Sequence, residues 1–164
     1  MKSDTPLMIE NFSGMDDDRH RIASAKEIEF ILNYIAKNGT RVALYYGDGN
    51  DFILTTLLDV DSEGLWLEQG RSDNLRITES DKLVFVSSHL QAKVQFTSSR
   101  AISMEHNGHT AFYLPLPSSI YRLQRREFYR LVVPADEPLY CAIVMGRPPK
   151  KRRCELIIKD ISGG

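Results

Sequence analysis

Cysteine is scarce in this chain of 164 residues, which contains only Cys141 and Cys154. Two cysteines cannot form the disulfide framework that small secreted domains use in place of a large core. The first twenty residues contain no apolar stretch of the kind found in secretory signals. No apolar run approaches the roughly 18 residues of a membrane-spanning helix. These absences favour a cytoplasmic protein without a membrane span.

Catalytic and metal-binding motifs are also missing. The sequence contains no phosphate-binding Walker loop, no G-x-S-x-G and no H-E-x-x-H. The pair His106 and His109 has no cysteine or carboxylate at the spacing of a zinc site, and we expect both rings to face solvent. We therefore expect no enzymatic activity and no cofactor.

Charge is unevenly distributed, although the net charge of the whole chain is only -1. From Ser119 onwards ten basic residues stand against five acidic ones, whereas the residues before Ser119 include 11 basic and 17 acidic ones. This asymmetry indicates two units with different tasks, of which the second faces an anion.

The hydrophobic pattern predicts a helix and then a series of strands. Residues 1–22 show no period, and we expect a flexible lead-in. Ser24 and Glu27 form a capping box, and apolar residues at helical spacing predict a helix over 25–38. A period of two then begins at Val42, with a turn at 47–50. The strands expected after that turn are 52–60, 64–69, 75–79, 82–88, 91–97, 99–105 and 109–114.

Short strands separated by regular turns are typical of a small antiparallel barrel or sandwich. Pro115 and Pro117 interrupt the series, so we place a domain over 23–117 and a second segment over 118–164. The second segment has expected strands at 138–145 and 151–159. A segment this short cannot bury a core of its own, and we expect an incomplete domain.

Three arginines, Arg125, Arg126 and Arg130, lie within six residues and alternate with aromatic Phe128 and Tyr129. A guanidinium group binds phosphate in a two-pronged manner, stacks on a base and grips the O6 and N7 atoms of guanine. The cluster therefore suits a ligand that is both anionic and aromatic. A solvated charged face along a linker is the alternative interpretation.

Asp160 and Ser162 near the chain's end are two residues apart, so on an extended strand they lie on one face. A carboxylate accepts hydrogen bonds from guanine N1–H and N2–H, and a hydroxyl group can donate or accept. An ordinary strand that ends in a turn is the alternative. Co-occurrence with the arginine cluster some thirty residues earlier favours a shared ligand site.

The segments Q-R-R-E-F-Y-R at 124–130 and D-I-S-G-G at 160–164 resemble the R-x-x-x-R and D/N-x-S-x-x-G signatures of the PilZ domain. The first 115 residues resemble the N-terminal domain of YcgR-type flagellar brake proteins. The resemblance implies a mainly β fold. It also implies an N-terminal helix and an antiparallel split barrel, followed by the first strands of a PilZ barrel. The motif's last glycine would be residue 165, so we expect the PilZ barrel to be truncated in this sequence.

The resemblance also implies the ligand and its residues. Members bind cyclic di-GMP where the two domains join, reorient the domains and act on flagellar motor or stator proteins at the basal body, which slows swimming. In this chain Arg126 and Arg130 would hold phosphate and guanine, and Arg125 would stack. Asp160 and Ser162 would read a guanine edge, with Gly164 ending the matching segment.

Two other interpretations remain open from the residues alone. Arg147 and the basic run 150–153 could contact the phosphates of a nucleic acid, although charged hairpin tips are usually only solvated. Trp66, Tyr45 and Tyr46 could anchor a protein partner, which would make the chain a pure interaction module. Aromatic residues in strands are more often part of a core.

Overall fold

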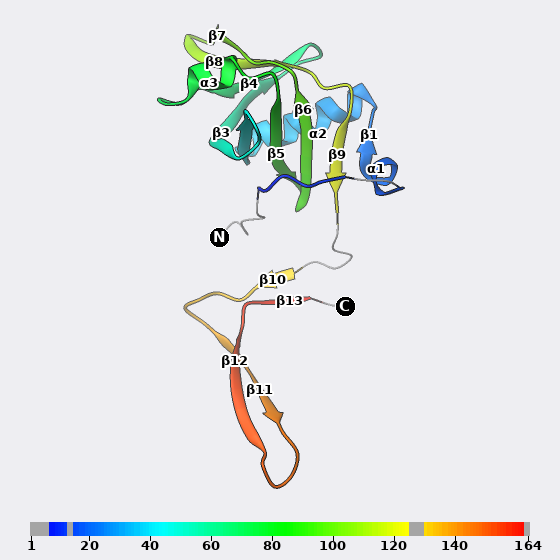
Figure 1. The fold of residues 1–164 in the computed structure, drawn as a ribbon, viewed down its shortest axis with the longest axis vertical. Helices are drawn as coiled ribbons and strands as arrows, with labels where there is room; N and C mark the ends of the chain where they lie inside the picture. The colour runs from blue at the N-terminus through cyan, green and yellow to red at the C-terminus, as the bar shows by residue number, and fades with distance from the viewer. Residues whose placement is uncertain (1–6, 13–14, 125–129, 163–164) are drawn as a thin grey trace. The chain divides into compact units, whose positions relative to one another are not determined.

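The computed structural model describes residues 7–12, 15–124 and 130–162 (Figure 1). The chain divides into two compact units after Gln124, here called the N-terminal and C-terminal units. The division lies beyond Pro117 because β9 (Ile120–Leu123) still pairs with β6 (Ala92–Ser98) inside the N-terminal unit. No helix among the described residues is long and apolar enough to cross a membrane.

The described part of the N-terminal unit contains a nine-stranded sheet with antiparallel neighbours throughout, which confirms the mainly β fold class. A bulge between Leu57 and Asp59 bends β3, so that its first half pairs with β2 and its second half with β4. The edge-to-edge order is β1 (Arg21–Ile22), β9, β6, β5 (Leu83–His89), β2 (Arg41–Tyr46), β3 (Asp51–Val60), β4 (Gly64–Glu68), β8 (His109–Pro115) and β7 (Ile102–His106).

Helix α2 (Ala25–Lys37) forms where the capping box predicted it. The Ser24 hydroxyl accepts a hydrogen bond from the Glu27 amide at 3.4 Å, and the helix ends at Asn38. Its apolar face packs against β3 and β5 and closes the main core. The buried residues on this face are Ile28, Ile31, Leu32 and Ile35.

Strand β2 is buried on both faces of the sheet. Val42 and Leu44 face the main core beneath α2, whereas Ala43 and Tyr45 belong to a second cluster on the outer face. Leu7 and Ile9 pack on that second cluster. We call residues 7–12 the strap. Within the lead-in that was expected to be flexible, the strap packs on the sheet, and α1 (Met15–His20) and β1 follow in the sequence.

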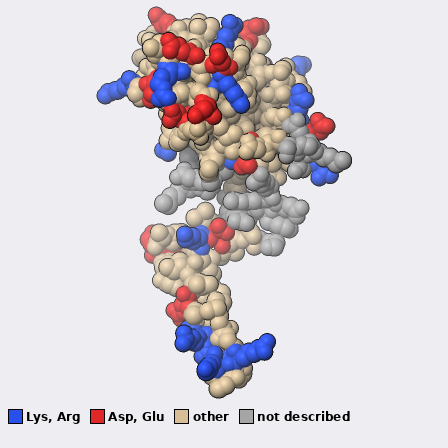
Figure 2. Space-filling view, viewed as in Figure 1, with Lys and Arg blue, Asp and Glu red and all other residues tan. Residues whose placement is uncertain are grey.

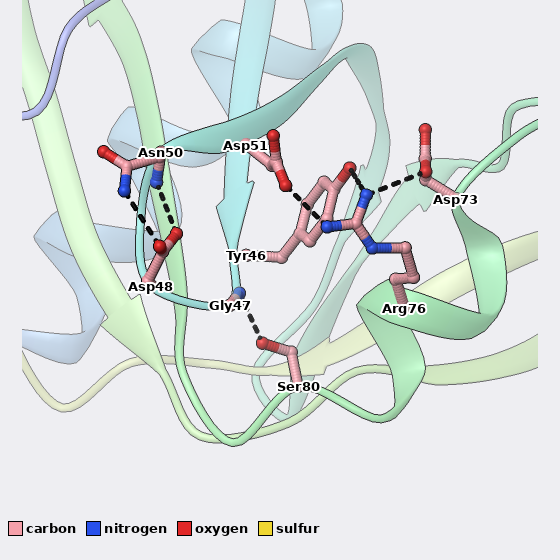
Figure 3. Close-up of polar contacts among 8 residues, drawn as sticks. All are labelled: Tyr46, Gly47, Asp48, Asn50, Asp51, Asp73, Arg76 and Ser80. Atoms are coloured by element: carbon pink, nitrogen blue, oxygen red, sulfur yellow. Dashed lines mark hydrogen bonds and ion pairs between the residues drawn. The ribbon is translucent and has the colours of Figure 1, made fainter.

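The strand expected at 75–79 is also wrong, because Asn74–Thr78 forms the short helix α3. The alternating apolar residues suggested a strand, but only Ile77 is buried, and Leu75 is 68% exposed. Arg76 holds α3 to the β2–β3 hairpin (Figure 3). Its guanidinium pairs with Asp51, and its central carbon lies 5.0 Å from the ring centre of Tyr46.

The described C-terminal unit consists of two short antiparallel ladders, β10 (Arg130–Val132) with β13 (Asp160–Ser162) and β11 (Leu139–Met145) with β12 (Arg152–Ile158). The strands expected at 138–145 and 151–159 are confirmed. Many apolar side chains of these ladders are exposed, as expected of a segment too short to enclose a core. They include Leu131, Leu139, Tyr140, Val144, Met145, Leu156, Ile157 and Ile161.

One buried histidine of the sheet has a well-defined charge state. His89 is 6% exposed, and its Nδ1 atom accepts a hydrogen bond from Nε of Arg122 at 3.1 Å. The Tyr34 ring meets it edge-on at 4.7 Å. Burial, and secondarily the charge of Arg122, lower the pKa of His89 below the ordinary value of 6.5. His89 is therefore neutral in the folded protein at neutral pH.

This depressed pKa predicts acid sensitivity. As the pH falls below 6.5, His89 becomes protonated more readily in the unfolded chain, so its contribution to stability declines until the lower native pKa is passed. We expect the melting temperature to fall between about pH 7 and pH 5, and His89→Gln to remove part of that fall. His109→Gln removes an exposed histidine and is the matched control. Identical pH profiles for wild type and His89→Gln would contradict the assignment.

Candidate functional site

The pairing of β10 with β13 brings together the two motifs singled out in the sequence. Arg130 lies opposite Ser162, Leu131 opposite Ile161 and Val132 opposite Asp160. The Val133 amide also donates a hydrogen bond to the Lys159 carbonyl at 2.9 Å, which continues the ladder beyond the paired strands. Positions separated by some thirty residues of sequence are thus cross-strand neighbours.

The register determines which positions share a face. Directly opposite residues of an antiparallel ladder lie on the same side, as do residues two apart on one strand. Positions 130, 160 and 162 therefore fall on one face of the β10–β13 ladder, and Leu131 and Ile161 fall on the other. Asp160 and Ser162 are both exposed. The face carries a carboxylate and a hydroxyl group beside the position of an arginine.

The structure brings together three of the six predicted site residues, Arg130, Asp160 and Ser162. Arg125, Arg126 and Gly164 lie outside the described residues.

The chemistry of this face suits a neutral base edge next to an anion. Asp160 can accept the two hydrogen bonds that guanine offers from N1–H and N2–H, and Ser162 can serve either role. An arginine at position 130 supplies a fork for phosphate or for guanine O6 and N7. Among the described residues no group of three or more His, Cys, Asp or Glu could hold a metal ion.

The basic run considered for nucleic-acid binding lies at the tip of the β11–β12 hairpin. Arg147, Lys150, Lys151, Arg152 and Arg153 are all exposed there. Lysine and arginine side chains gather at this tip in Figure 2. The only ion pair between described residues at the tip joins Arg153 to Glu155 at 3.7 Å, and both side chains are well exposed. Such a pair contributes little to stability.

The aromatic residues considered as partner anchors are packed. Tyr45 and Tyr46 are 9% and 4% exposed. The Trp66 ring stacks on His106 at 4.6 Å and contacts the Tyr113 ring at 5.1 Å. The expectation that His106 faces solvent is therefore wrong, because its ring is covered by Trp66.

Sequence reasoning missed two buried polar residues on β6. Lys93 and Gln95 are 8% and 7% exposed, although residues of these types usually face water. Both hydrogen-bond to the strap. Their alternation with Val94 and Phe96 fits an ordinary strand with one polar face, so only the structure reveals that the polar face is covered.

Comparison with known proteins finds relatives that cover most of the chain. Residues 20–122 match the PilZN domain of the flagellar regulator YcgR. The flagellar brake protein YcgR of Nitrosospira multiformis is 30% identical over 155 residues, which cover 91% of this chain and 59% of that relative. The chain thus spans less than two thirds of the relative's length.

Two solved structures share the fold. The crystal structure of Escherichia coli YcgR in complex with c-di-GMP matches with a TM-score of 0.72 and 19% identity, over 88% of this chain and 62% of that one. The K. pneumonia MrkH–c-di-GMP complex matches with a TM-score of 0.58 and 25% identity, over 87% of this chain and 59% of that one. Since the matched PilZN domain covers more than half of the sequence, the chain belongs to the family of YcgR flagellar regulators.

Proposed function

We propose that this protein is a cyclic di-GMP effector that controls the flagellar motor. The observation that carries the proposal is the β10–β13 register, in which position 130 lies opposite Ser162 and two residues from the level of Asp160. Support comes from the relatives, since YcgR of E. coli and MrkH were both solved with c-di-GMP and the N. multiformis relative is a flagellar brake protein.

Each residue of the proposed site has a distinct task. Arg126 and Arg130 bind phosphate and the O6 and N7 atoms of guanine, and Arg125 stacks on a base. Asp160 accepts hydrogen bonds from guanine N1–H and N2–H, Ser162 completes the edge, and Gly164 closes the segment. Binding of this kind uses charge and hydrogen bonds, so no covalent bond is made or broken.

The location of the arginines suggests how binding is transmitted. Arg125 and Arg126 directly follow Gln124, where the N-terminal unit ends. A ligand that engages these arginines together with β13 constrains the segment that joins the two units. We propose that this constraint changes the orientation of the units and that the changed form engages motor or stator proteins at the flagellar basal body.

Replacing either central arginine should weaken ligand binding. Loss of a charged hydrogen bond costs about 1.5–3 kcal/mol, so Arg126→Ala and Arg130→Ala should each raise the Kd for cyclic di-GMP by about 10- to 150-fold. Isothermal titration calorimetry measures this directly. Arg147→Ala removes the same charge from the hairpin tip and should bind as wild type. Wild-type affinity in both site variants would refute the assignment.

Asp160 should determine the choice of base. Adenine lacks the N1–H and N2–H donors of guanine. The Asp160→Ala variant should therefore bind cyclic di-GMP more weakly, and its Kd values for cyclic di-GMP and cyclic di-AMP should lie closer together than in wild type. The ratio of the two Kd values is the measurement. Glu155→Ala removes an exposed carboxylate from neighbouring β12 and is the control. An unchanged ratio in Asp160→Ala would exclude this residue from base recognition.

Nucleic-acid binding is a second candidate function, because the basic residues at the tip of the β11–β12 hairpin are exposed. The two functions differ in salt dependence, because a contact with several phosphates of a polymer loses about 10³–10⁵ in affinity between 50 and 200 mM salt. A site for one ligand with two phosphates should lose far less. Arg147→Ala would weaken the polymer contact while sparing the cyclic dinucleotide.

A further inference from the structure

The strap crosses the outer face of the sheet (Figure 1). Side chains of the sheet hold it there. The Tyr45 hydroxyl donates to the Leu7 carbonyl at 2.7 Å, and Lys93 Nζ donates to the Met8 carbonyl at 2.8 Å. The Gln95 amide donates to the Glu10 carbonyl at 3.0 Å and accepts from the Glu10 amide at 2.8 Å. These four bonds contact backbone groups, which any extended peptide presents.

Selectivity comes from three side chains of the strap. Leu7 and Ile9, two residues apart, pack on Val84, Val86 and their neighbours in β2. The Glu10 carboxylate accepts a hydrogen bond from Lys93 Nζ at 2.7 Å, in an ion pair whose side chains are only 9% and 23% exposed. The face therefore fits an extended segment with an apolar residue, any residue, a second apolar residue and then glutamate.

The strap is attached differently from the strands. No residue of 7–12 belongs to a strand, so the strap is not tied to the sheet by a backbone ladder. Both hydrogen bonds that Lys93 Nζ makes among the described residues go to the strap. The strap also lies outside residues 20–122, the part that matches the PilZN domain. A segment held by a few side chains can leave without unfolding the sheet.

We propose that the outer face of β2, β5 and β6 is a docking site for an extended partner peptide of this apolar-x-apolar-Glu pattern, and that the strap is its resident occupant. We call Ala43, Tyr45, Val84, Val86, Lys93 and Gln95 the docking face. A partner segment of the same chemistry displaces the strap by competing for the same hydrogen bonds. The face lies wholly in the N-terminal unit, and none of its residues belongs to the proposed nucleotide site.

Displacement has a consequence at β9. Phe12 stacks on Tyr121 with ring centres 4.2 Å apart and planes at 13°. Tyr121 belongs to the strand that leads into the arginine segment. Departure of the strap removes this stack, so a docked partner alters the packing of the last strand before Arg125.

The test uses the full chain with its strap disabled. In the variant Leu7→Asp/Ile9→Asp two carboxylates oppose burial of the strap, which leaves the docking face open. A fluorescein-labelled peptide of residues 6–12 should bind this variant at least about tenfold more tightly than wild type, because the native strap competes in wild type. Fluorescence anisotropy reports binding. A peptide carrying Glu10→Lys should bind the variant much more weakly.

Two further variants test whether the peptide binds at the docking face. Lys93→Met added to the open variant should abolish most peptide binding, because the partner of the glutamate is lost. Leu75→Asp changes an exposed leucine on α3, outside the docking face, and should leave the wild-type result unchanged. The proposal is overturned if the open variant keeps its circular dichroism and melting transition but does not bind the peptide.

Hydrogen exchange tests the wild-type chain independently, should the open variant fail to fold. The Glu10 amide, bonded to Gln95, should exchange at least about tenfold faster than the Val86 amide of β5, because the strap opens locally. Addition of excess unlabelled strap peptide should accelerate exchange at Glu10 and leave exchange at Val86 unchanged. Exchange of Glu10 as slow as that of Val86 would show that the strap is part of the core and would overturn the proposal.

Discussion

The antiparallel pairing of β10 with β13 is the constraint on which the proposed site depends. It converts two short motifs, separated by some thirty residues, into cross-strand neighbours with Arg130 opposite Ser162. A slip of one residue would move Asp160 and Ser162 to the face of Leu131. The Val133–Lys159 hydrogen bond continues this register at one end of the ladder. The proposed recognition of a guanine edge therefore depends on backbone geometry as much as on the identity of the side chains.

The N-terminal unit achieves its stability by covering both faces of its central strands. Helix α2 closes the main core on one face, and the strap covers the second cluster around Tyr45 on the other. The two covers differ in kind. The helix buries a continuous apolar stripe, whereas the strap contributes two apolar side chains and a set of polar contacts to Lys93 and Gln95. The strap, and not the helix, is the cover that a competing peptide can replace.

Sequence patterns predicted the elements whose signals are local. The cap at Ser24 and the periodic apolar residues located α2, and the alternation from Val42 located most strands. Helix α3 was mistaken for a strand because the apolar residues Leu75 and Ile77 alternate with polar ones. The ion pair that holds the helix joins Arg76 to Asp51, which lies in a hairpin distant in the sequence. The strap could not be predicted, since its contacts join residues far apart in the sequence, 38 positions for Leu7 with Tyr45 and 83 for Glu10 with Lys93. The shared face of Asp160 and Ser162 followed from their spacing, but the partner strand did not.

The excess positive charge from Ser119 onwards suggested an anionic partner, yet five of the ten basic residues there lie at the β11–β12 hairpin tip and not at the β10–β13 ladder. Asp160 lies two residues after the end of β12 at Ile158, whereas Arg147 lies beyond the opposite end of the hairpin. Seven residues of strand span about 20 Å. Since the Debye length in physiological salt is about 8 Å, the tip cations act only weakly at the ladder. The proposed specificity therefore depends on the residues that the register gathers and not on the net charge of the segment.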